Sequence, residues 1–231
     1  MSGTILITGS NRGIGLEVCT QFARDGWRVF ACCRDLDSAA ALKSLQDAHP
    51  RVELIQLDVT DQAQMLSLGE ALKGEPIDIL LNNAGYYGPK GVRFGKVDRS
   101  EWRRVLESNT IAPYMMSETF CDNVAASGHK VIAMMSSKVG SIADNRSGGG
   151  YIYRTSKTAL NQVVKSLSID LRERGITVLA LHPGWVKTAM GGPGALIATE
   201  QSVGGLKKIL LEADITYSGH FYDYDGCEIP W

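Results

Sequence analysis

The sequence lacks an excess of charge of either sign. Its 24 basic and 25 acidic residues leave a formal net charge of −1 at pH 7. Binding to nucleic acid or to an anionic membrane normally requires a basic face, so neither is expected as a partner. Long apolar runs are also missing, because no stretch approaches the ~18 uninterrupted apolar residues that suggest a membrane-spanning helix.

Cysteine is scarce and shows no ligand spacing. The five cysteines are odd in number, with no C-x-x-C pair and no Cys/His pattern; they are Cys19, Cys32, Cys33, Cys121 and Cys227. We therefore expect mostly reduced thiols, no metal site and a cytoplasmic protein. The first residues, MSGTILITGS, lack the basic segment and long apolar region of a signal peptide, which favours the same location.

Internal repeats, low-complexity segments and interdomain linkers are absent as well. Hydrophobic residues make up 44% of the chain and charged residues 21%, a globular composition with enough apolar material for a core. A single α/β sheet domain of 231 residues is ordinary. We expect one domain over residues 1–231.

Short apolar runs alternate with segments of helical periodicity. The expected strands are Thr4–Ile7, Arg28–Cys33, Val52–Leu57, Ile77–Asn82, Lys130–Met135, Ile176–Leu181 and one near His220–Tyr222. The first six are mostly unbroken apolar runs, as is typical of strands buried on both faces of a parallel sheet. The expected helices are Gly13–Asp25, Ser38–Ala48, Asp61–Lys73, Arg99–Ala126, Tyr151–Arg174 and Glu200–Glu212. This alternation predicts a single doubly wound (Rossmann) α/β domain with a seven-stranded, mostly parallel sheet flanked by helices.

A glycine-rich turn follows the first strand. It is made of Gly9, Ser10, Asn11, Arg12, Gly13, Ile14 and Gly15. Glycines at a strand–helix junction let backbone amides approach a pyrophosphate, and the positive end of the helix dipole stabilises the bound anion. The alternative is a structural turn, but the position at the first strand–helix junction favours a dinucleotide site.

The end of the second strand bears on which dinucleotide is bound. An NAD site usually carries an acid here, whereas this chain has Cys33 followed by Arg34. A guanidinium can bind a 2′-phosphate, and Arg12 could reach the same group from the glycine turn. The alternatives are two solvated arginines, or Asp35 acting as a weak NAD determinant. We favour NADP(H), with NAD(H) second.

Two further strand ends fit the same groove. Asp58 and Val59 follow the third strand, and Asp58 could accept a hydrogen bond from the adenine amino group. Asn83, Ala84 and Gly85 follow the fourth strand, where small residues let the backbone pass near the adenosine ribose. Asn82 is interpreted as structural, tying neighbouring strands together.

The stretch YIYRTSK begins at Tyr151. Residues four apart share a helix face, so Tyr153 and Lys157 are neighbours, whereas Tyr151 faces Thr155. A cation about 5 Å away contributes roughly 3 kcal/mol at an effective dielectric of ~20, which predicts a lowered pKa for Tyr153. Tyr153 could then protonate a carbonyl oxygen, Ser137 could bond the same oxygen, and Lys157 could hold the nicotinamide ribose. Taken alone, a tyrosine and a lysine at this spacing are more often an amphipathic helix surface.

The sequence as a whole resembles the short-chain dehydrogenase/reductase family. TGSNRGIG, LDV, NNAG, ESNTIAP, SSKVGS, YRTSK and PGWVKT occur in the family's order over residues 4–188. The resemblance implies a catalytic set of Asn109, Ser137, Tyr153 and Lys157, with Asn109 holding a proton-relay water. It also implies that Pro183, Gly184, Val186 and Thr188 bind the nicotinamide amide. The details look like the classical NADP-preferring subgroup, and ACCRDLDSA and FYDYDGCEIPW are similar to its C-factor/sniffer-like carbonyl reductase branch.

The substrate side is less well defined by the sequence. The loop 144–150 is slightly longer than is common in the family and could shape the mouth of the site. Tyr86, Tyr87, Trp185 and the Gly/Ala-rich stretch 189–199 are the expected rim, with that stretch as a mobile lid around 185–200. The alternative for the stretch is a flexible loop over the core. We expect a small carbonyl or alcohol substrate.

Two hypotheses follow for function. The first is an NADPH-dependent carbonyl reductase, and the second is a regulatory protein that binds NAD(P) with little or no turnover. An intact acid favours the enzyme. Apolar residues on several faces of Arg99–Ala126 and Tyr151–Arg174 also suggest a homodimer or homotetramer, although a buried central helix would look the same.

Overall fold

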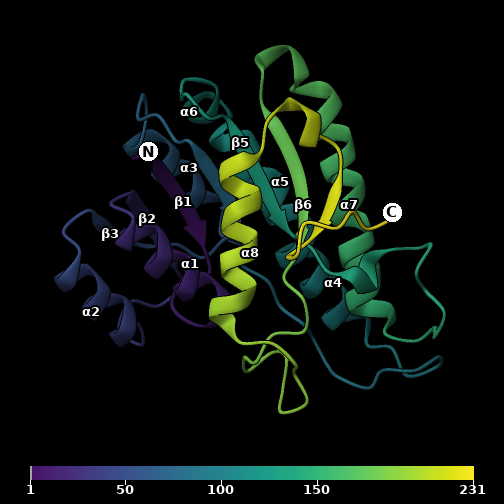
Figure 1. Ribbon diagram of the computed structural model, residues 1–231. Helices are drawn as coiled ribbons and strands as arrows, with labels where there is room; N and C mark the ends of the chain where they lie inside the picture. The colour runs from purple at the N-terminus through teal and green to yellow at the C-terminus, as the bar shows by residue number, and fades with distance from the viewer. Residues whose placement is uncertain (1) are drawn as a thin grey trace.

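The computed structural model describes residues 2–231, and its centre is a seven-stranded sheet. The strands are β1 (Thr4–Thr8), β2 (Arg28–Cys33), β3 (Val52–Gln56), β4 (Ile79–Asn82), β5 (Val131–Met135), β6 (Thr177–His182) and β7 (Phe221–Asp223). Their order is β3-β2-β1-β4-β5-β6-β7, and every neighbouring pair is parallel. The predicted doubly wound domain is confirmed, with a wholly parallel sheet (Figure 1).

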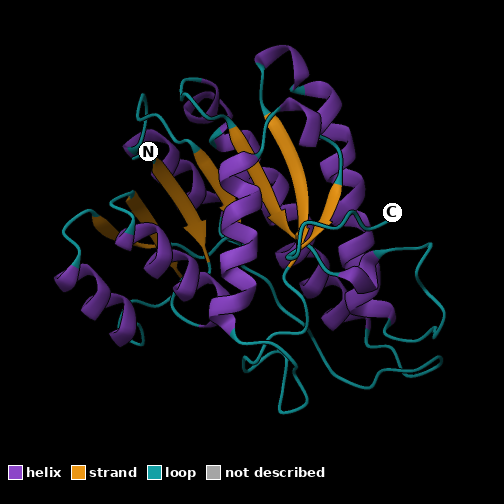
Figure 2. Ribbon diagram, in the orientation of Figure 1, coloured by secondary structure: helices purple, strands orange, loops and turns teal. Residues whose placement is uncertain are grey.

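Helices cover both faces of this sheet (Figure 2). They are α1 (Gly13–Arg24), α2 (Ala40–Ala48), α3 (Gln62–Ala71), α4 (Arg99–Leu106), α5 (Ala112–Thr119), α6 (Cys121–Ala125), α7 (Tyr151–Asp170) and α8 (Thr199–Glu212). Short 3₁₀ turns occupy Lys138–Gly140, Arg172–Arg174 and Ile215–Tyr217. Gly26 and Gly175 follow helical segments with φ of +78° and +69°, which a glycine adopts without steric cost.

The sheet separates two apolar cores. Along β1, Ile5 and Ile7 point into the core formed with α1, α2 and α8, whereas Leu6 points into the core formed with α3, α5 and α7. All three side chains are fully buried, as a strand covered on both faces requires. The edge strand β3 differs from the prediction, because Glu53 and Gln56 are exposed.

The predicted single helix Arg99–Ala126 is wrong. A π-helical turn, Glu107–Ile111, separates α4 from α5, and a non-helical residue, Phe120, separates α5 from α6. Proline has no N–H, so Pro113 cannot donate to the carbonyl four residues earlier, that of Asn109. The regular α-helical ladder therefore cannot continue unchanged past this point, and π turns of this kind are frequent at functional sites.

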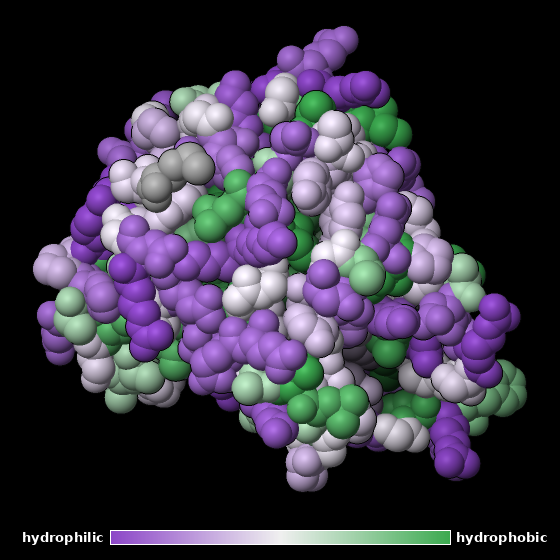
Figure 3. Space-filling view, viewed as in Figure 1, coloured by the Kyte–Doolittle hydropathy of each residue, from purple (hydrophilic) through white to green (hydrophobic). Residues whose placement is uncertain are grey.

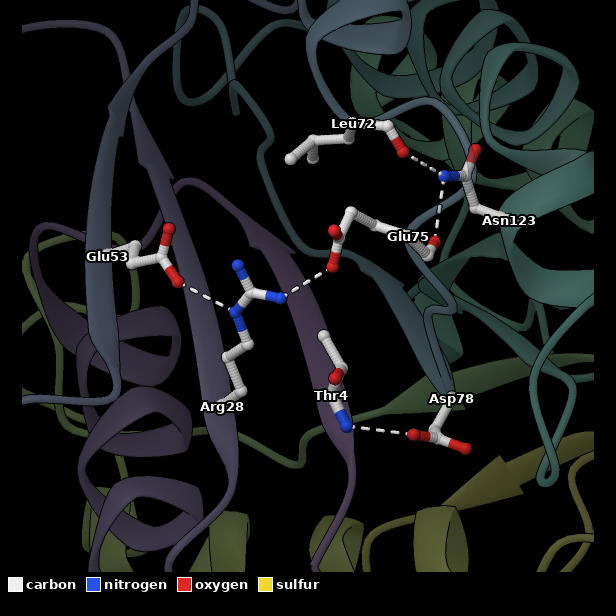
Figure 4. Close-up of polar contacts among 7 residues, drawn as sticks. All are labelled: Thr4, Arg28, Glu53, Leu72, Glu75, Asp78 and Asn123. Carbon is white, nitrogen blue, oxygen red and sulfur yellow. Dashed lines mark hydrogen bonds and ion pairs between the residues drawn. The ribbon is translucent and has the colours of Figure 1, made fainter.

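Polar contacts gather at the amino ends of the strands (Figure 4). Arg28 at the start of β2 bonds Glu53 of β3 at 2.7 Å and Glu75, in the loop before β4, at 2.6 Å. The Thr4 amide donates to Asp78, and Asn123 donates to the carbonyls of Leu72 and Glu75. These bonds hold together the amino ends of the strands, at the end of the sheet opposite the candidate site.

Within residues 2–231, no helix is long and apolar enough to cross a membrane. The same part of the chain holds no group of three or more His, Cys, Asp or Glu side chains that could bind a metal ion. All five cysteines are free thiols.

Candidate active site

The loops that leave the carboxyl ends of the strands meet along one edge of the sheet, at the bottom of Figure 1. The glycine turn lies at the centre of this edge. Gly9 has a φ of +68°, and a Cβ built on it would lie 2.8 Å from the Cα of Ala84. A Cβ on Gly13 would lie 3.3 Å from the Thr188 side chain. The turn after β1 is therefore in close contact with the segments after β4 and β6, as the sequence predicts for one groove.

Thr8 and Asn83 hold this turn in place. The Thr8 hydroxyl accepts hydrogen bonds from the backbone amides of Asn83 and Ala84, at 3.1 and 3.0 Å. The side-chain amide of Asn83 donates to the carbonyls of Thr8 and Gly9, at 2.9 and 3.0 Å. Asn83 thus shapes the glycine turn with its side chain, and Thr8 is a supporting residue that the sequence reasoning missed although it belongs to the TGSNRGIG motif.

Ser10 does not occupy the place predicted for it. Its backbone amide and its hydroxyl both donate to the carbonyl of Cys32, at 3.0 and 2.8 Å, and the residue is fully buried. Neither donor is left for a phosphate, so Ser10 joins the glycine turn to β2. The backbone amides nearer the start of α1 remain, where Asn11, Arg12, Gly13 and Ile14 lie at least partly exposed.

Two cations lie in the turns after β1 and β2. Arg12 and Arg34 are exposed, and neither forms an ion pair with another residue in the range 2–231. Between them, Cys33 is 2% exposed where an NAD site usually has an acid. The Asp35 carboxylate accepts from the Asp37 amide at 2.9 Å, and hydrogen bonds from Ser38 and Asp37 lower its pKa. The residues present fit a 2′-phosphate better than a free ribose hydroxyl.

Asp58 and Val59 lie where the third strand ends. One Asp58 oxygen accepts from the amide and the hydroxyl of Thr60, at 2.9 and 2.7 Å. Val59 is partly buried against the core that contains Leu57. Asn82 is 3% exposed and donates to Ser117 of α5 at 3.3 Å, which agrees with a structural role but ties the strand to a helix instead of a neighbouring strand.

The four residues of the predicted catalytic set come from three elements. Tyr153 and Lys157 lie in the first two turns of α7, Ser137 follows β5, and Asn109 lies in the π turn. The Lys157 ammonium lies 5.7 Å from the centre of the Tyr153 ring and donates to the Met135 carbonyl at 2.8 Å. A Cβ on Gly85 would lie 3.3 Å from Asn109 Oδ1 and 3.8 Å from Lys157 Nζ. The set and the glycine-containing turn after β4 therefore share one site.

Asn109 uses its side chain entirely within the protein. Its Oδ1 accepts from the Tyr86 amide at 2.8 Å, and its Nδ2 donates to the Tyr86 carbonyl and the Ser156 hydroxyl, at 2.9 and 3.0 Å. The residue is fully buried. A water held by Asn109 would have to bind its backbone carbonyl, which lacks an α-helical partner because residue 113 is proline.

The pKa of Tyr153 shifts in the direction opposite to the prediction. Burial raises the pKa of this phenol, the nearby Tyr87 raises it further, and hydrogen bonding from Ser137 opposes both. Lys157 is 4% exposed, and its burial lowers the pKa of the ammonium to about 8. The sequence argument used the spacing of the two residues but could not include the removal of water, which raises the pKa of the phenol and lowers that of the ammonium.

The ring of Tyr87 covers Tyr153. Its ring stacks on that of Tyr153 with centres 4.4 Å apart and an interplanar angle of 25°. Tyr86, predicted as part of the same rim, instead bonds Glu101 at 2.9 Å and lies under Arg104. Tyr151 lines a separate cleft between residues 91–94 and 147–150. Of the three tyrosines around the predicted site, only Tyr87 contacts Tyr153 through its ring.

The stretch after β6 forms a loop closed on itself. Val186 and Ile197 form a parallel bridge, and the Trp185 indole donates to the Gly191 carbonyl at 2.9 Å. Gly184 has a φ of +78°, and the Pro183 carbonyl accepts from Ser202 at the start of α8. Met190 and Leu196, two apolar residues of the predicted lid, are exposed.

The model of one protein family matches residues 3–195 of the chain, and its description is short chain dehydrogenase. The chain belongs to this family. The C-signal protein of Myxococcus xanthus is 39% identical over 156 residues, which are 68% of this chain and 93% of that protein. The structure of carbonyl reductase Sniffer of D. melanogaster superimposes with a TM-score of 0.94 at 33% identity over the full length of both chains.

A second solved structure is similar over nearly the whole length. The NADPH-bound carbonyl reductase from chicken fatty liver has a TM-score of 0.92 and 34% identity, and covers 100% of this chain and 99% of its own. The chain is thus a short-chain dehydrogenase/reductase of the carbonyl reductase-like branch, and the resemblance read from its motifs is confirmed. The predicted site residues lie at the carboxyl ends of the strands, where doubly wound sheets bind their ligands.

Proposed function

We propose that this short-chain dehydrogenase/reductase is an NADPH-dependent carbonyl reductase in which Tyr153 is the general acid. The observation that carries the proposal is the convergence of Tyr153, Ser137 and Lys157 beside Gly85, in the turn after β4 that packs against the glycine turn. The raised pKa of Tyr153 keeps the phenol protonated at neutral pH, which is the form that carbonyl reduction requires. A lowered pKa would have suited alcohol oxidation better.

Each residue of the catalytic set has a separate role in the proposed reduction. When bound, the reduced nicotinamide supplies a hydride to the carbonyl carbon. Tyr153 donates its proton to the carbonyl oxygen, so that the product is the neutral alcohol. Ser137 bonds the same oxygen and orients it. Lys157 is held by the Met135 carbonyl beside Tyr153 and can return a proton to the phenolate, with the Asn109 carbonyl holding the water that connects this lysine to solvent.

The glycine turn and its flanking residues hold the nucleotide. The N-terminus of α1 faces the pyrophosphate, and Arg12 and Arg34 bind the 2′-phosphate. In the bound nucleotide, Asp58 would meet the adenine, Ala84 and Gly85 would border the adenosine ribose, and Pro183, Gly184, Val186 and Thr188 would hold the nicotinamide amide. The carbonyl reductase from chicken fatty liver binds NADPH in its solved structure, which supports the same preference here. Arg34→Ala should therefore weaken NADPH far more than NADH in a fluorescence titration; equal losses would refute the assignment.

The reaction is tested by NADPH oxidation against a panel of aldehydes and ketones. Tyr153→Phe should abolish turnover and keep NADPH binding, because only the ionisable hydroxyl is removed. Tyr217→Phe is the matched control, because Tyr217 lies in the 3₁₀ turn before β7, at the amino end of the sheet. Turnover that survives in Tyr153→Phe, or is lost equally in both variants, would contradict the role of Tyr153.

A second candidate function has its own observation. The C-signal protein is 39% identical over 68% of this chain, so a regulatory role based on NADP(H) binding is the rival proposal. An NADPH-bound protein with no Tyr153-dependent turnover of any carbonyl in the panel would favour it. The complete set of Asn109, Ser137, Tyr153 and Lys157 favours the enzyme, because a sensor has no use for a proton donor.

We also propose a homo-oligomer in the reducing cytoplasm. The residues that suggested an interface from the sequence, among them Val105, Leu160 and Val164, are buried inside the chain and do not support it. Other apolar side chains nearby are exposed, namely Ile111, Tyr114 and Ile169. Light scattering on Ile169→Glu, compared with the wild type, tests whether this surface joins subunits.

A further inference from the structure

Three loops at the carboxyl end of the sheet, those after β4, β5 and β6, lie around Tyr153. They cover residues 84–98, 137–150 and 183–198 and are called the mouth loops below. They contain six basic residues: Lys90, Arg93, Lys96, Lys138, Arg146 and Lys187. They contain two acidic residues, Asp98 and Asp144, although the chain as a whole has a net charge of −1. The mouth of the site is therefore positively charged in a nearly neutral protein.

The two acids are already engaged. Asp98 caps α4, accepting from the amides of Ser100 and Glu101 at 2.7 and 3.0 Å. Asp144 lies 3.9 Å from Lys138. The other five basic side chains form no ion pair within residues 2–231. Asp225 of the C-terminal segment also acts on Lys138, but the other five cations have no carboxylate partner in the described part of the chain, and a positive field of this kind concentrates anions.

Lys90 is the cation that the contacts tie to the reaction centre. Its ammonium lies 5.8 Å from the centre of the Tyr87 ring, and that ring stacks on Tyr153 at 4.4 Å. The same ammonium donates to the Met190 carbonyl at 3.3 Å, which joins the loop after β4 to the loop after β6. Lys90 is thus placed one aromatic ring away from the proton donor, across the mouth, with two of its N–H donors still available.

The residues that follow Lys90 border a cleft that contains a further cation. A cleft of about 500 Å³ lies between residues 91–94 and 147–151, lined by Arg93, Phe94 and Tyr151 among others. Phe94 is 88% exposed. Along the lower edge of Figure 3, where the mouth loops lie in Figure 1, apolar and polar side chains alternate on the surface. The lining of the cleft combines one cation, Arg93, and two aromatic rings with glycines and Ser147, so a flat molecule with an anionic end has partners here.

We infer that the substrates are carbonyl compounds with an anionic group, such as a carboxylate, remote from the carbonyl, and that Lys90 is the specificity-determining residue that binds this anion. The inference rests on the proposed reductase function and adds the substrate class. Tyr153 and Ser137 hold the carbonyl oxygen, Tyr87 forms the flat wall beside the substrate, and Lys90 bonds the carboxylate. The nucleotide's own phosphates are served by a different region, the glycine turn with Arg12 and Arg34.

The test compares 4-formylbenzoate with its uncharged methyl ester. Each reduction consumes one NADPH and one proton and gives the corresponding benzyl alcohol. The wild type should prefer the carboxylate in kcat/KM. Lys90→Met should lower kcat/KM for the carboxylate about fivefold and Lys90→Glu roughly twentyfold, the range expected for one partly exposed charge pair and for its reversal. Both variants should leave the ester within about twofold, and Lys208→Met on α8, also an exposed lysine, is the matched control.

Other outcomes would overturn the inference. If the ester is reduced as well as the carboxylate, or if Lys90→Met slows both equally, Lys90 only tethers the loop at Met190. If Lys90→Met instead raises the KM of NADPH, the positive mouth serves the nucleotide. Calorimetric binding of 4-formylbenzoate to the NADPH complex of Tyr153→Phe gives a readout without turnover. Weaker binding in Tyr153→Phe/Lys90→Met supports the anion site even if the proposed reductase activity fails, and unchanged binding refutes it.

Discussion

The effect of Lys157→Met on the free energy of unfolding should depend on pH. The substitution should favour the folded state most at pH 7 and least at high pH. In the folded chain Lys157 is 4% exposed, and its pKa falls from an ordinary 10.5 to about 8. Between these two values the unfolded chain binds more protons than the folded one, so the stability of the wild type rises with pH there. The lysine therefore opposes folding most strongly at pH 7 and least at high pH.

The magnitude follows from the size of the shift. Holding a proton on the buried lysine costs the folded state roughly 3 kcal/mol at pH 7 and less than about 1 kcal/mol at pH 10. Methionine keeps most of the side-chain volume and has no charge, so this cost disappears in the variant. The hydrogen bond to the Met135 carbonyl is also lost, but that loss is the same at every pH. The difference in unfolding free energy between the two proteins should thus change by about 2 kcal/mol over this pH range.

Urea denaturation at pH 7, 8.5 and 10, followed by circular dichroism, measures this difference. Other titrating groups are common to both proteins and cancel in the comparison. Lys165→Met, an exposed lysine on the same helix, is the matched control and should show no such pH dependence. A wild type and a Lys157→Met variant whose stabilities stay parallel from pH 7 to pH 10 would show that Lys157 is well solvated and would refute the argument.

Three further results are expected. Gly15→Ala should weaken NADPH binding and lower the melting temperature, at a cost of about 1–3 kcal/mol, because its Cβ would lie 2.3 Å from the Gly9 carbonyl oxygen; a variant with wild-type affinity would contradict the packing of the turn. Arg28→Met should lower the free energy of unfolding, measured by urea denaturation, by about 1 kcal/mol. The loss is small because its partners Glu53 and Glu75 are half exposed, and kcat should not change. Tyr87→Ala should admit water to Tyr153 and move the alkaline limb of the kcat profile to lower pH, since burial and Tyr87 both raise the pKa of that phenol; an unmoved limb would exclude Tyr87 as its cover.

Most of the fold could be predicted because buried parallel strands and glycine-capped helices leave clear marks in a sequence. β1, β2 and β5 are recovered within a residue of their ends. The segment Arg99–Ala126 could not be resolved, because its apolar periodicity is helical throughout. The π turn depends on one missing N–H, that of Pro113, and on tertiary bonds from Asn109 to Tyr86 and Ser156.

The residues of the candidate site could be predicted from the sequence, but the hydrogen-bond and stacking partner of each side chain could not. Spacing selected Tyr153 over Tyr151, yet it could not tell that Tyr86 would bond Glu101 while Tyr87 would stack on Tyr153. Both tyrosines lie in one irregular loop, where no periodicity fixes the direction of a side chain. Ser10 was misplaced for a similar reason, since its two donors meet the Cys32 carbonyl only after β2 has paired with β1.

The contacts around Arg28 have a consequence for how this protein can be changed. They lie at the amino end of the sheet (Figure 4), whereas the glycine turn and the segment that leads to Tyr153 leave its carboxyl end. Substitutions at distant sites without shared partners usually contribute additively, within about 0.5 kcal/mol. Variation at the Arg28 end can therefore alter the thermal tolerance of the protein independently of variation at Lys90. Thermal stability and substrate preference can therefore be changed separately, by substitutions at opposite ends of the same sheet.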